Sequence, residues 1–344
     1  MELATKKKSA TDAVSGLERQ LRSGRFVVTA ELSPPVSADP AEFVARAVAL
    51  QGLAVAVNVT DGAGSRAHLS SLAAAHFLVQ NRIEPVLQMT CRDRNRIALQ
   101  GELLGAAALG IRNVLALRGD DPRAGDQPDA KPVFDLDTTG LLAMAHRMRT
   151  EHRLPSGAEI KGNFRLVLGA GEIPVDPPAD WRPNGLLAKL EAGADFIQTQ
   201  FCMDASVVRR YAARLVDLGV AQRLPILIGV APIPSARSAR WIREKLYGSL
   251  IPDGIVERLE HASDPKSEGT KICVEFMQEL AEIPGIAGVH VMAPNNHSAL
   301  AEVIAISGSR GKGALRRNEV SRVRKPSGWQ GERWHAAADQ GAAR

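Results

Sequence analysis

Eight short apolar runs alternate with eight longer segments of helical period along most of this chain, beginning at Phe26. Several of the runs are rich in Val, Ile and Leu without polar alternation, as expected for strands that are buried on both faces. Strands and helices that alternate in this way form parallel sheets, because each helix carries the chain back to the start of the next strand. Eight such units over roughly 280 residues suit a closed TIM (β/α)8 barrel better than an open doubly wound sheet.

The predicted boundaries divide the chain into one barrel and two flanking extensions. Strands are expected at 26–32, 54–60, 84–90, 113–119, 165–171, 196–201, 225–231 and 288–293, and helices at 40–51, 68–81, 94–110, 138–152, 183–193, 205–219, 235–247 and 297–307. An extra stretch at 252–282, with Asp264-Pro265 as a start signal, is expected to insert one or two helices before strand eight. The barrel then takes residues 23–308, between a flexible N-terminal extension (1–22) and a basic, disordered tail (309–344).

The tail carries the positive charge of the chain. Residues 309–344 hold nine Lys/Arg against three Asp/Glu, so the formal charge of +5 leaves the first 308 residues near −1. Trp329 and Trp334 lie among the basic residues, but the spacing matches no nucleic-acid recognition module. We therefore expect a solvated extension rather than a nucleic-acid-binding arm.

Targeting and redox signals favour a cytoplasmic protein. No apolar stretch reaches the length of about 18 residues that suggests a membrane span, and no apolar segment follows Lys6-Lys7-Lys8 as it would in a secretory signal. The three cysteines, odd in number and far apart, are Cys91, Cys202 and Cys273, which argues against a disulfide framework or a cysteine zinc site. His290 and His297 have no third ligand nearby in the sequence, so no metal is expected.

Polar residues gather where the predicted strands end. Glu31 closes the first apolar run and Asp120 follows the fourth. A carboxylate beside apolar strands costs free energy unless it is paired, hydrated or part of a functional site. Two carboxylates at equivalent strand ends therefore suggest one shared site. Amides and hydroxyls close other strands, and in a TIM barrel these ends meet at the C-terminal mouth. This set of groups predicts a pocket for a polar heteroaromatic ligand.

Five short segments resemble, in order, the signature of methylenetetrahydrofolate reductases. They are Ala30-Glu31-Leu32-Ser33-Pro34-Pro35, Asn58-Val59-Thr60-Asp61-Gly62, Met89-Thr90-Cys91, Leu117-Arg118-Gly119-Asp120 and Gly193-Ala194-Asp195-Phe196-Ile197-Gln198-Thr199-Gln200-Phe201. The resemblance covers about residues 24–307. Five motifs in the right order are strong evidence for this family, although each motif alone would be weak evidence. Residues 91–95 and 133–137 resemble the branch in which the reductase is sometimes fused to a homocysteine methyltransferase domain.

The resemblance implies a barrel that holds FAD, accepts hydride from NADH or NADPH and passes it to 5,10-methylenetetrahydrofolate, giving 5-methyltetrahydrofolate. Opening of the five-membered folate ring requires a proton at N10, and Glu31 matches the family's general acid. Asp120, the second catalytic residue, matches the family's aspartate beside the flavin and pterin rings. Its ionised carboxylate suits the pterin N–H donors and makes the reduced flavin a better hydride donor.

Further positions match the family's ligand contacts. The implied cofactor contacts are Thr60, Asp61, Gln88, Arg118, Gly119, Asp120, Glu172 and Lys189, and the implied substrate contacts are Glu31, Gln200, Phe201 and Asn296. Arg118 could neutralise a flavin phosphate or pair with Asp120. The chain departs from the well-studied branch at Gln88, which replaces a histidine, and from another branch at Asn296, which replaces an arginine.

Other functions of the same barrel stay open at this point. The enzyme could run in reverse, oxidising methyltetrahydrofolate in a demethylation pathway, or could pass hydride directly from the nicotinamide without flavin. A barrel methyltransferase acting on methyltetrahydrofolate would need similar pterin contacts but no flavin. A non-catalytic folate-binding or nucleic-acid-associated protein is a third class. The residues do not distinguish NADH from NADPH, and a homo-oligomer is compatible with them.

Overall fold

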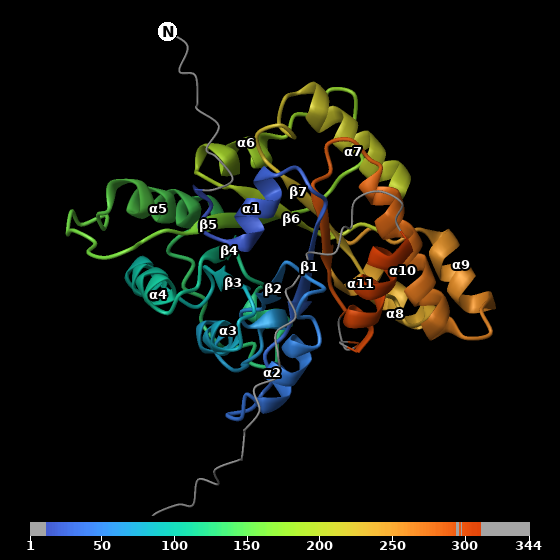
Figure 1. Ribbon diagram of the computed structural model, residues 1–344, viewed down its shortest axis with the longest axis horizontal. Coiled ribbons are helices and arrows are strands. Elements are labelled where there is room, and N and C mark those ends of the chain that lie inside the picture. The colour runs from blue at the N-terminus through green and yellow to red at the C-terminus, as the bar shows by residue number, and fades with distance from the viewer. Residues whose placement is uncertain (1–11, 294–295, 297, 311–344) are drawn as a thin grey trace, which may run out of the picture.

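The chain folds into a closed barrel of eight parallel strands in chain order (Figure 1). The computed structural model describes residues 12–293, 296 and 298–310. The strands are β1 (Val27–Leu32), β2 (Ala56–Val59), β3 (Pro85–Thr90), β4 (Asn113–Leu117), β5 (Val167–Glu172), β6 (Phe196–Phe201), β7 (Ile226–Val230) and β8 (Gly288–Val291). Strand β1 closes the ring, since Thr29 pairs with Ala56 of β2 and Val27 pairs with Gly288 of β8. The predicted TIM barrel is confirmed.

Most of the described α-helices lie outside the barrel and connect its strands, whereas the first precedes β1 and the last follows β8. They are α1 (Gly16–Arg22), α2 (Ala41–Val48), α3 (Ser71–Gln80), α4 (Arg96–Ala108), α5 (Thr138–Glu151), α6 (Asn184–Glu191), α7 (Ala205–Asp217), α8 (Ala236–Lys245), α9 (Asp253–His261), α10 (Pro265–Ala281) and α11 (Ser298–Arg310). Side chains of Asn95, Asp137 and Asp204 cap the N-termini of α4, α5 and α7. None of the described helices combines the length and apolar character needed to cross a bilayer.

The predicted insertion before strand eight is confirmed as α9 and α10, and α10 begins at the Asp264-Pro265 signal. Helix α8 differs from the predicted crossover helix. The chain after it returns to the carboxyl end of β6, where Leu250 N donates to Phe201 O at 2.9 Å. Both ends of α8 therefore lie near the barrel mouth, and α10 packs beside β8. The apolar period at 235–247 predicted a helix correctly, but helical period alone does not determine where a helix packs.

The barrel interior is layered from apolar at its base to polar at its mouth. One cluster of buried side chains fills the base, formed by Leu17, Val27, Ala56, Val86, Leu115, Val167, Phe196 and Leu227. Gly169 leaves room for the Phe196 ring, because a Cβ there would lie 2.3 Å from that ring. Side chains along a strand alternate between faces, so the next inward positions form a second layer nearer the mouth.

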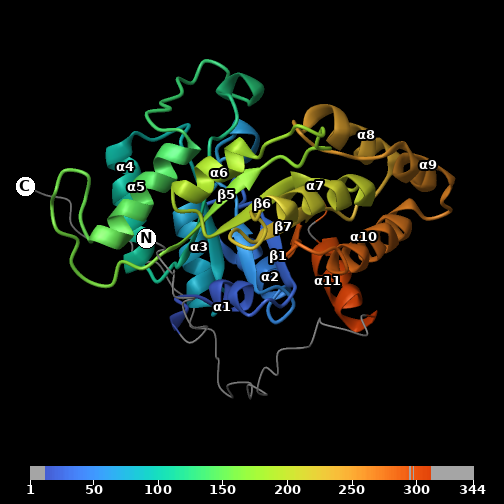
Figure 2. The same cartoon turned by 90° about the horizontal axis from the view of Figure 1, so that it is seen from above.

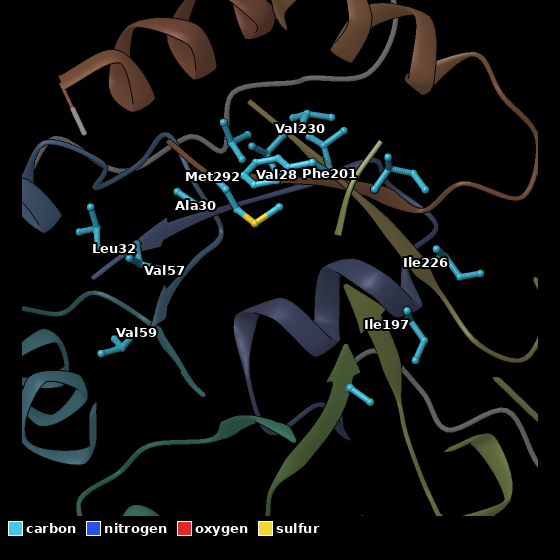
Figure 3. Packing of buried hydrophobic residues seen from close by; sticks show 14 of the residues in the cluster. Val28, Ala30, Leu32, Val57, Val59, Ile197, Phe201, Ile226, Val230 and Met292 are labelled. Atoms are coloured by element: carbon cyan, nitrogen blue, oxygen red, sulfur yellow. The ribbon is translucent and has the colours of Figure 1, made fainter. Parts of the chain in front are cut away.

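The larger core lies between the strands and the surrounding helices. Figure 3 shows Val28, Ala30 and Leu32 of β1 in this outer core, together with Val57 and Val59 of β2. Because these positions face outward, Thr29 and Glu31 of β1 face the barrel interior. The side-chain alternation of β1 thus places a predicted catalytic carboxylate inside the mouth.

The predicted flexible extension over 1–22 is wrong for its second half, because Gly16–Arg22 form helix α1. Figure 2 shows α1 at one end of the barrel and α8 at the other, so α1 lies at the base. Leu17 is fully buried in the base layer, and Glu84 accepts hydrogen bonds from Gly16 N at 2.7 Å and Leu17 N at 2.8 Å. A seven-residue helix has too short a period to recognise from sequence, and its stability comes from these tertiary contacts. The predicted tail beyond Arg310 lies outside the described residues.

Candidate active site

A hydrogen-bonded layer of polar side chains crosses the barrel above its apolar base. Asn58 Nδ2 on β2 donates to Gln198 Oε1 on β6 at 2.6 Å, and Gln198 Nε2 donates to Thr29 Oγ1 on β1 at 3.0 Å. Strand β6 is a neighbour of neither β1 nor β2 in the sheet, so Gln198 meets the other two side chains inside the barrel. All three are buried, and each satisfies the polar groups of another.

His290 connects this polar layer to Glu31. On β8, its Nδ1 lies 3.0 Å from Thr29 Oγ1 and its Nε2 lies 3.3 Å from Glu31 Oε2. Gln88 Nε2 donates to the same carboxylate oxygen at 2.7 Å. Whereas His290 and Gln88 are buried, the Glu31 side chain is 22% exposed. Glu31 is therefore the outermost member of the network and faces the mouth.

The geometry of Glu31 suits proton transfer to a ligand. Both Gln88 and His290 contact Oε2, whereas Oε1 has no hydrogen-bond partner among the described residues. Two neighbours thus orient the carboxyl group and leave one oxygen available at the mouth. A held carboxyl group with one free oxygen is the arrangement that a general acid needs.

Two residues of this network differ from their predicted roles. Gln88 was expected to contact a cofactor, but its amide nitrogen donates to Glu31 and so positions the acid. The sequence pattern assigned His290 no role in the site, because it was considered only as a metal ligand and no metal was expected there; in the structure it contacts Glu31. It faces inward because it lies two residues after Gly288, which pairs with the inward-facing Val27, and only the strand register shows this.

The carboxylate of Asp61 is already bonded within the protein. Its Oδ2 accepts from Thr90 N at 2.8 Å and from Thr90 Oγ1 at 2.9 Å, and it also pairs with Arg94. Its Oδ1 accepts from Ser71 Oγ at 3.1 Å. These contacts argue against the predicted direct cofactor contact and indicate that Asp61 holds the β2 and β3 loops together. The neighbouring Thr60 is different, because its Oγ1 is buried and has no hydrogen-bond partner within the described parts of the chain.

Arg118 and Asp120 extend to the surface after β4 and are both exposed. The Arg118 guanidinium lies 4.4 Å from the centre of the Phe134 ring, and no ion pair joins it to Asp120 among the described residues. The backbone of Asp120 is held instead, since Ser65 Oγ donates to its carbonyl at 3.0 Å. Its carboxylate therefore stays accessible at the mouth.

Gly119 makes the turn between these two residues possible. Its φ of +87° favours glycine, and a Cβ there would lie 2.9 Å from Arg92 Cβ. Arg92 is itself a buried residue that the sequence did not single out. Its Nη1 donates to Ser65 Oγ at 3.0 Å and to Gly62 O at 3.2 Å, which joins the loops that follow β2 and β3. Hydrogen bonding with Asp93 raises the pKa of the Arg92 guanidinium above its usual value.

Glu172 and Lys189 form an ion pair at the end of β5. Lys189 Nζ donates to Glu172 Oε2 at 2.9 Å and to Gly171 O at 2.7 Å. An ammonium group has three N–H donors, so one donor of Lys189 is left for a ligand. The predicted cofactor contacts at these two positions therefore depend on a lysine that is already partly neutralised.

A bulge in β6 places Gln200. The register between β6 and β7 shifts between Gln198 and Phe201, and Thr199 Oγ1 accepts from Gly229 N at 2.9 Å. A bulge bends a strand and changes the direction of the side chains that follow it. Gln200 is only partly buried, and its Oε1 accepts from Phe201 N at 3.0 Å.

Two further predicted substrate residues are placed less favourably. Phe201 is 2% exposed and packs in the outer core near Val230 and Met292 (Figure 3), which argues against a direct contact between its ring and a substrate. Asn296 lies half-buried between β8 and α11, and its backbone N donates to Ala293 O at 3.0 Å. Its neighbours 294, 295 and 297 lie outside the described residues.

The family model for methylenetetrahydrofolate reductase matches residues 16–308 of this chain. The chain belongs to this family. Curated members include a probable methylenetetrahydrofolate reductase (NADPH) from Caenorhabditis elegans, 29% identical over 242 residues that cover 68% of this chain and 34% of that protein. Methylenetetrahydrofolate reductase 2 from Schizosaccharomyces pombe is 28% identical over 261 residues, covering 73% of this chain and 40% of that protein.

The matched region is a part of each of these reductases, about a third to two fifths of their length. A bacterial 5,10-methylenetetrahydrofolate reductase from Pectobacterium carotovorum subsp. carotovorum is 27% identical, with 61% of this chain and 65% of that protein covered. Among solved structures, an uncharacterized protein from Clostridium thermocellum has the same barrel, with a TM-score of 0.58 at 12% identity, covering 85% of this chain and 97% of that one.

Proposed function

We propose that this protein transfers hydride from NADH or NADPH to 5,10-methylenetetrahydrofolate and forms 5-methyltetrahydrofolate. The proposal depends above all on Glu31, whose carboxyl group is held by Gln88 and His290 and keeps one oxygen available at the mouth. The Caenorhabditis elegans relative is named as an NADPH enzyme, and a further relative, from Arabidopsis thaliana, is named methylenetetrahydrofolate reductase (NADH) 1. The Clostridium thermocellum protein with the same fold is described as binding two copies of 5-methyl-5,6,7,8-tetrahydrofolic acid, which supports the ligand class.

In this proposal, Glu31 donates a proton from Oε1 to N10 of the folate and so opens its five-membered ring. Gln88 and His290 keep the carboxyl group in place while the proton moves. Asp120 supplies the fixed negative charge for the pterin N–H donors, since its carboxylate is exposed and its backbone is held by Ser65. Gln200, placed by the β6 bulge, would hydrogen-bond the same ring system.

The residues at the mouth fit a flavin. Thr60 Oγ1 is buried and has no partner among the residues that the structure describes, so a polar atom of a bound ring would complete its hydrogen bonding. Gly119 brings backbone close to the mouth without a side chain, and Lys189 keeps one N–H donor for a phosphate. When bound, FAD would accept hydride from the nicotinamide and deliver it to the methylene carbon. Asp61 would act indirectly, through the loops it holds.

The test combines a spectrum with two half-reactions. A yellow purified protein would support FAD and count against a barrel methyltransferase. Anaerobic assays with each nicotinamide and methylenetetrahydrofolate, and with methyltetrahydrofolate in the reverse direction, then test turnover. Glu31→Gln should abolish folate turnover but spare nicotinamide oxidation, because an amide cannot protonate N10. Absence of turnover in both directions would disprove the proposed activity, and equal loss of both half-reactions in the variant would disprove the role of Glu31.

The same proposal includes a cytoplasmic location. Cys91, Cys202 and Cys273 are all buried free thiols, which supports a reducing compartment.

A further inference from the structure

The segment after α8, Tyr247–Leu250, forms part of the barrel rim, and we call it the rim segment. It is attached to the end of β6, because Leu250 N donates to Phe201 O at 2.9 Å and Leu250 O accepts from Met203 N at 2.8 Å. On its other side, Gly248 has a φ of +80° and packs so closely on Ile173 that a Cβ would lie 2.7 Å from that side chain. The rim segment therefore bridges the mouth ends of β5 and β6.

Tyr247 lies beside a residue of the proposed substrate site. Its carbonyl oxygen accepts a hydrogen bond from Gln200 Nε2 at 3.4 Å, and its side chain is 87% exposed. An exposed aromatic ring is unremarkable when it stands alone on a surface. This ring belongs to a residue whose backbone contacts Gln200, and a tight glycine turn follows it. The hydrogen bond from Gln200 thus fixes the backbone of Tyr247 at the mouth.

A second feature of the rim segment points to a ligand. Ser249 is 9% exposed, and its buried Oγ has no hydrogen-bond partner in residues 12–293, 296 and 298–310. A buried hydroxyl that lacks a partner costs free energy, and a ligand with a polar atom at this position would remove that cost. Thr60 Oγ1, at the end of β2, is in the same state.

We propose that the rim segment forms the outer wall of the folate site and that Tyr247 stacks on the aryl ring of the aminobenzoyl-glutamate tail. The inference extends the proposed function and rests on it. A pterin held near Glu31 and Asp120 leaves its tail to emerge through the mouth, where the aryl ring passes the side of Gln200. Ser249 Oγ bonds a polar atom of the same tail. Tyr247 and Ser249 therefore act in substrate binding and specificity rather than in hydride or proton transfer.

The experiment compares a complete folate with a ligand that lacks the tail. Binding of 5-methyltetrahydrofolate and of 6-methyltetrahydropterin is titrated calorimetrically against the wild type, Tyr247→Ala and Tyr247→Phe. Stacking predicts that Tyr247→Ala binds the folate about three- to tenfold more weakly, that Tyr247→Phe binds it normally, and that neither change affects the tail-less pterin. Trp241→Ala is the matched control, because Trp241 is a 46% exposed aromatic residue on α8 itself, and this variant should bind both ligands as the wild type does.

Ser249→Ala provides an independent measurement. Because the hydroxyl has no partner in the part of the chain that the structure describes, its removal should leave the melting temperature unchanged or slightly higher while weakening folate binding severalfold. A serine with a purely structural role would lower the melting temperature and leave affinity unchanged.

The outcomes separate this inference from the proposed function. If the wild type binds the folate and Tyr247→Ala binds it equally well, the rim inference fails and the proposed function stands. The inference also fails if Tyr247→Ala weakens both ligands alike, or if Trp241→Ala reproduces its effect. If the wild type binds neither ligand, the proposed function itself fails.

Discussion

Helix α1 should stabilise the barrel through a single carboxylate at its base. Glu84 accepts three hydrogen bonds, from Gly16 N at 2.7 Å, Leu17 N at 2.8 Å and Asn113 Nδ2 at 2.9 Å. Two of these donors are the first free N–H groups of α1, where a negative charge also interacts favourably with the helix dipole. Substitution of Glu84 by alanine removes all three bonds and that charge at once.

The expected loss follows from these contacts. A hydrogen bond to a charged group contributes about 1.5–3 kcal/mol, but the site is partly exposed and water can replace some of the lost bonds. We therefore expect Glu84→Ala to lower the free energy of unfolding by about 2–4 kcal/mol. For a domain of this size the melting temperature should then fall by about 4–8 °C.

Thermal and urea unfolding, followed by circular dichroism, measure this effect. The matched control is Glu42→Ala on α2, whose carboxylate is 80% exposed and lies 3.8 Å from Arg46, so its loss should cost less than about 1 kcal/mol. Folate turnover well below the melting temperature should be unchanged in both variants, because α1 lies at the end opposite the mouth (Figure 2). A melting temperature for Glu84→Ala within a degree of the Glu42→Ala value would refute this account of α1.

Further predictions concern the site, the bulge, the thiols and the tail. Gln88→Ala should reduce kcat for folate at least tenfold while nicotinamide oxidation persists, because Glu31 loses its closest hydrogen-bond donor, at 2.7 Å. Equal effects on both half-reactions would contradict this role of Gln88. Gly229→Ala should destabilise the fold by more than about 2 kcal/mol, since the alanine Cβ would lie 2.4 Å and 2.7 Å from two carbonyl oxygens of β6. A urea unfolding midpoint equal to that of the wild type would disprove this prediction. Burial raises the pKa of the Cys91 thiol to about 11 and that of the Cys202 thiol to about 12, so both thiols stay protonated at pH 8 and become thiolates only at much higher pH. Mass spectrometry of the native protein treated with iodoacetamide at pH 8 should therefore find neither cysteine alkylated. Deletion of residues 311–344 should leave folate turnover unchanged, and a loss of turnover in steady-state assays would show that the tail contributes to activity.

Local pattern predicted the elements and the strand ends well. The apolar runs predicted eight strands because a strand that is buried on both faces consists almost entirely of apolar residues. Asp264-Pro265 correctly predicted the start of α10. Helix α1 was missed because its stability depends on Glu84, 68 positions away from Gly16. The α8 segment was correctly predicted as helical but wrongly placed, since nothing in its period indicates that the chain returns to the mouth.

In the candidate active site, too, local sequence places some residues and not others. Glu31 and Asp120 could be placed at the mouth from sequence because the end of a strand is a local property and all parallel strands of a barrel end on the same side. Phe201 was assigned from the family resemblance, but alternation from the inward-facing Phe196 directs it outward, and the structure finds it in the outer core. Only the tertiary structure shows that Gln200 lies beside Tyr247, where its Nε2 donates to the Tyr247 carbonyl at 3.4 Å.

The sequence by itself thus determined the barrel, the order of its strands and the chemistry at their carboxyl ends, because these depend on hydrophobic period and strand length. The tertiary structure alone decided which side chains meet. His290 contacts Glu31 across 259 positions, and Asn58 bonds Gln198 across the interior, because closure and register bring distant strands together. Contacts of this kind depend on the geometry of the whole ring, which no local stretch of sequence contains.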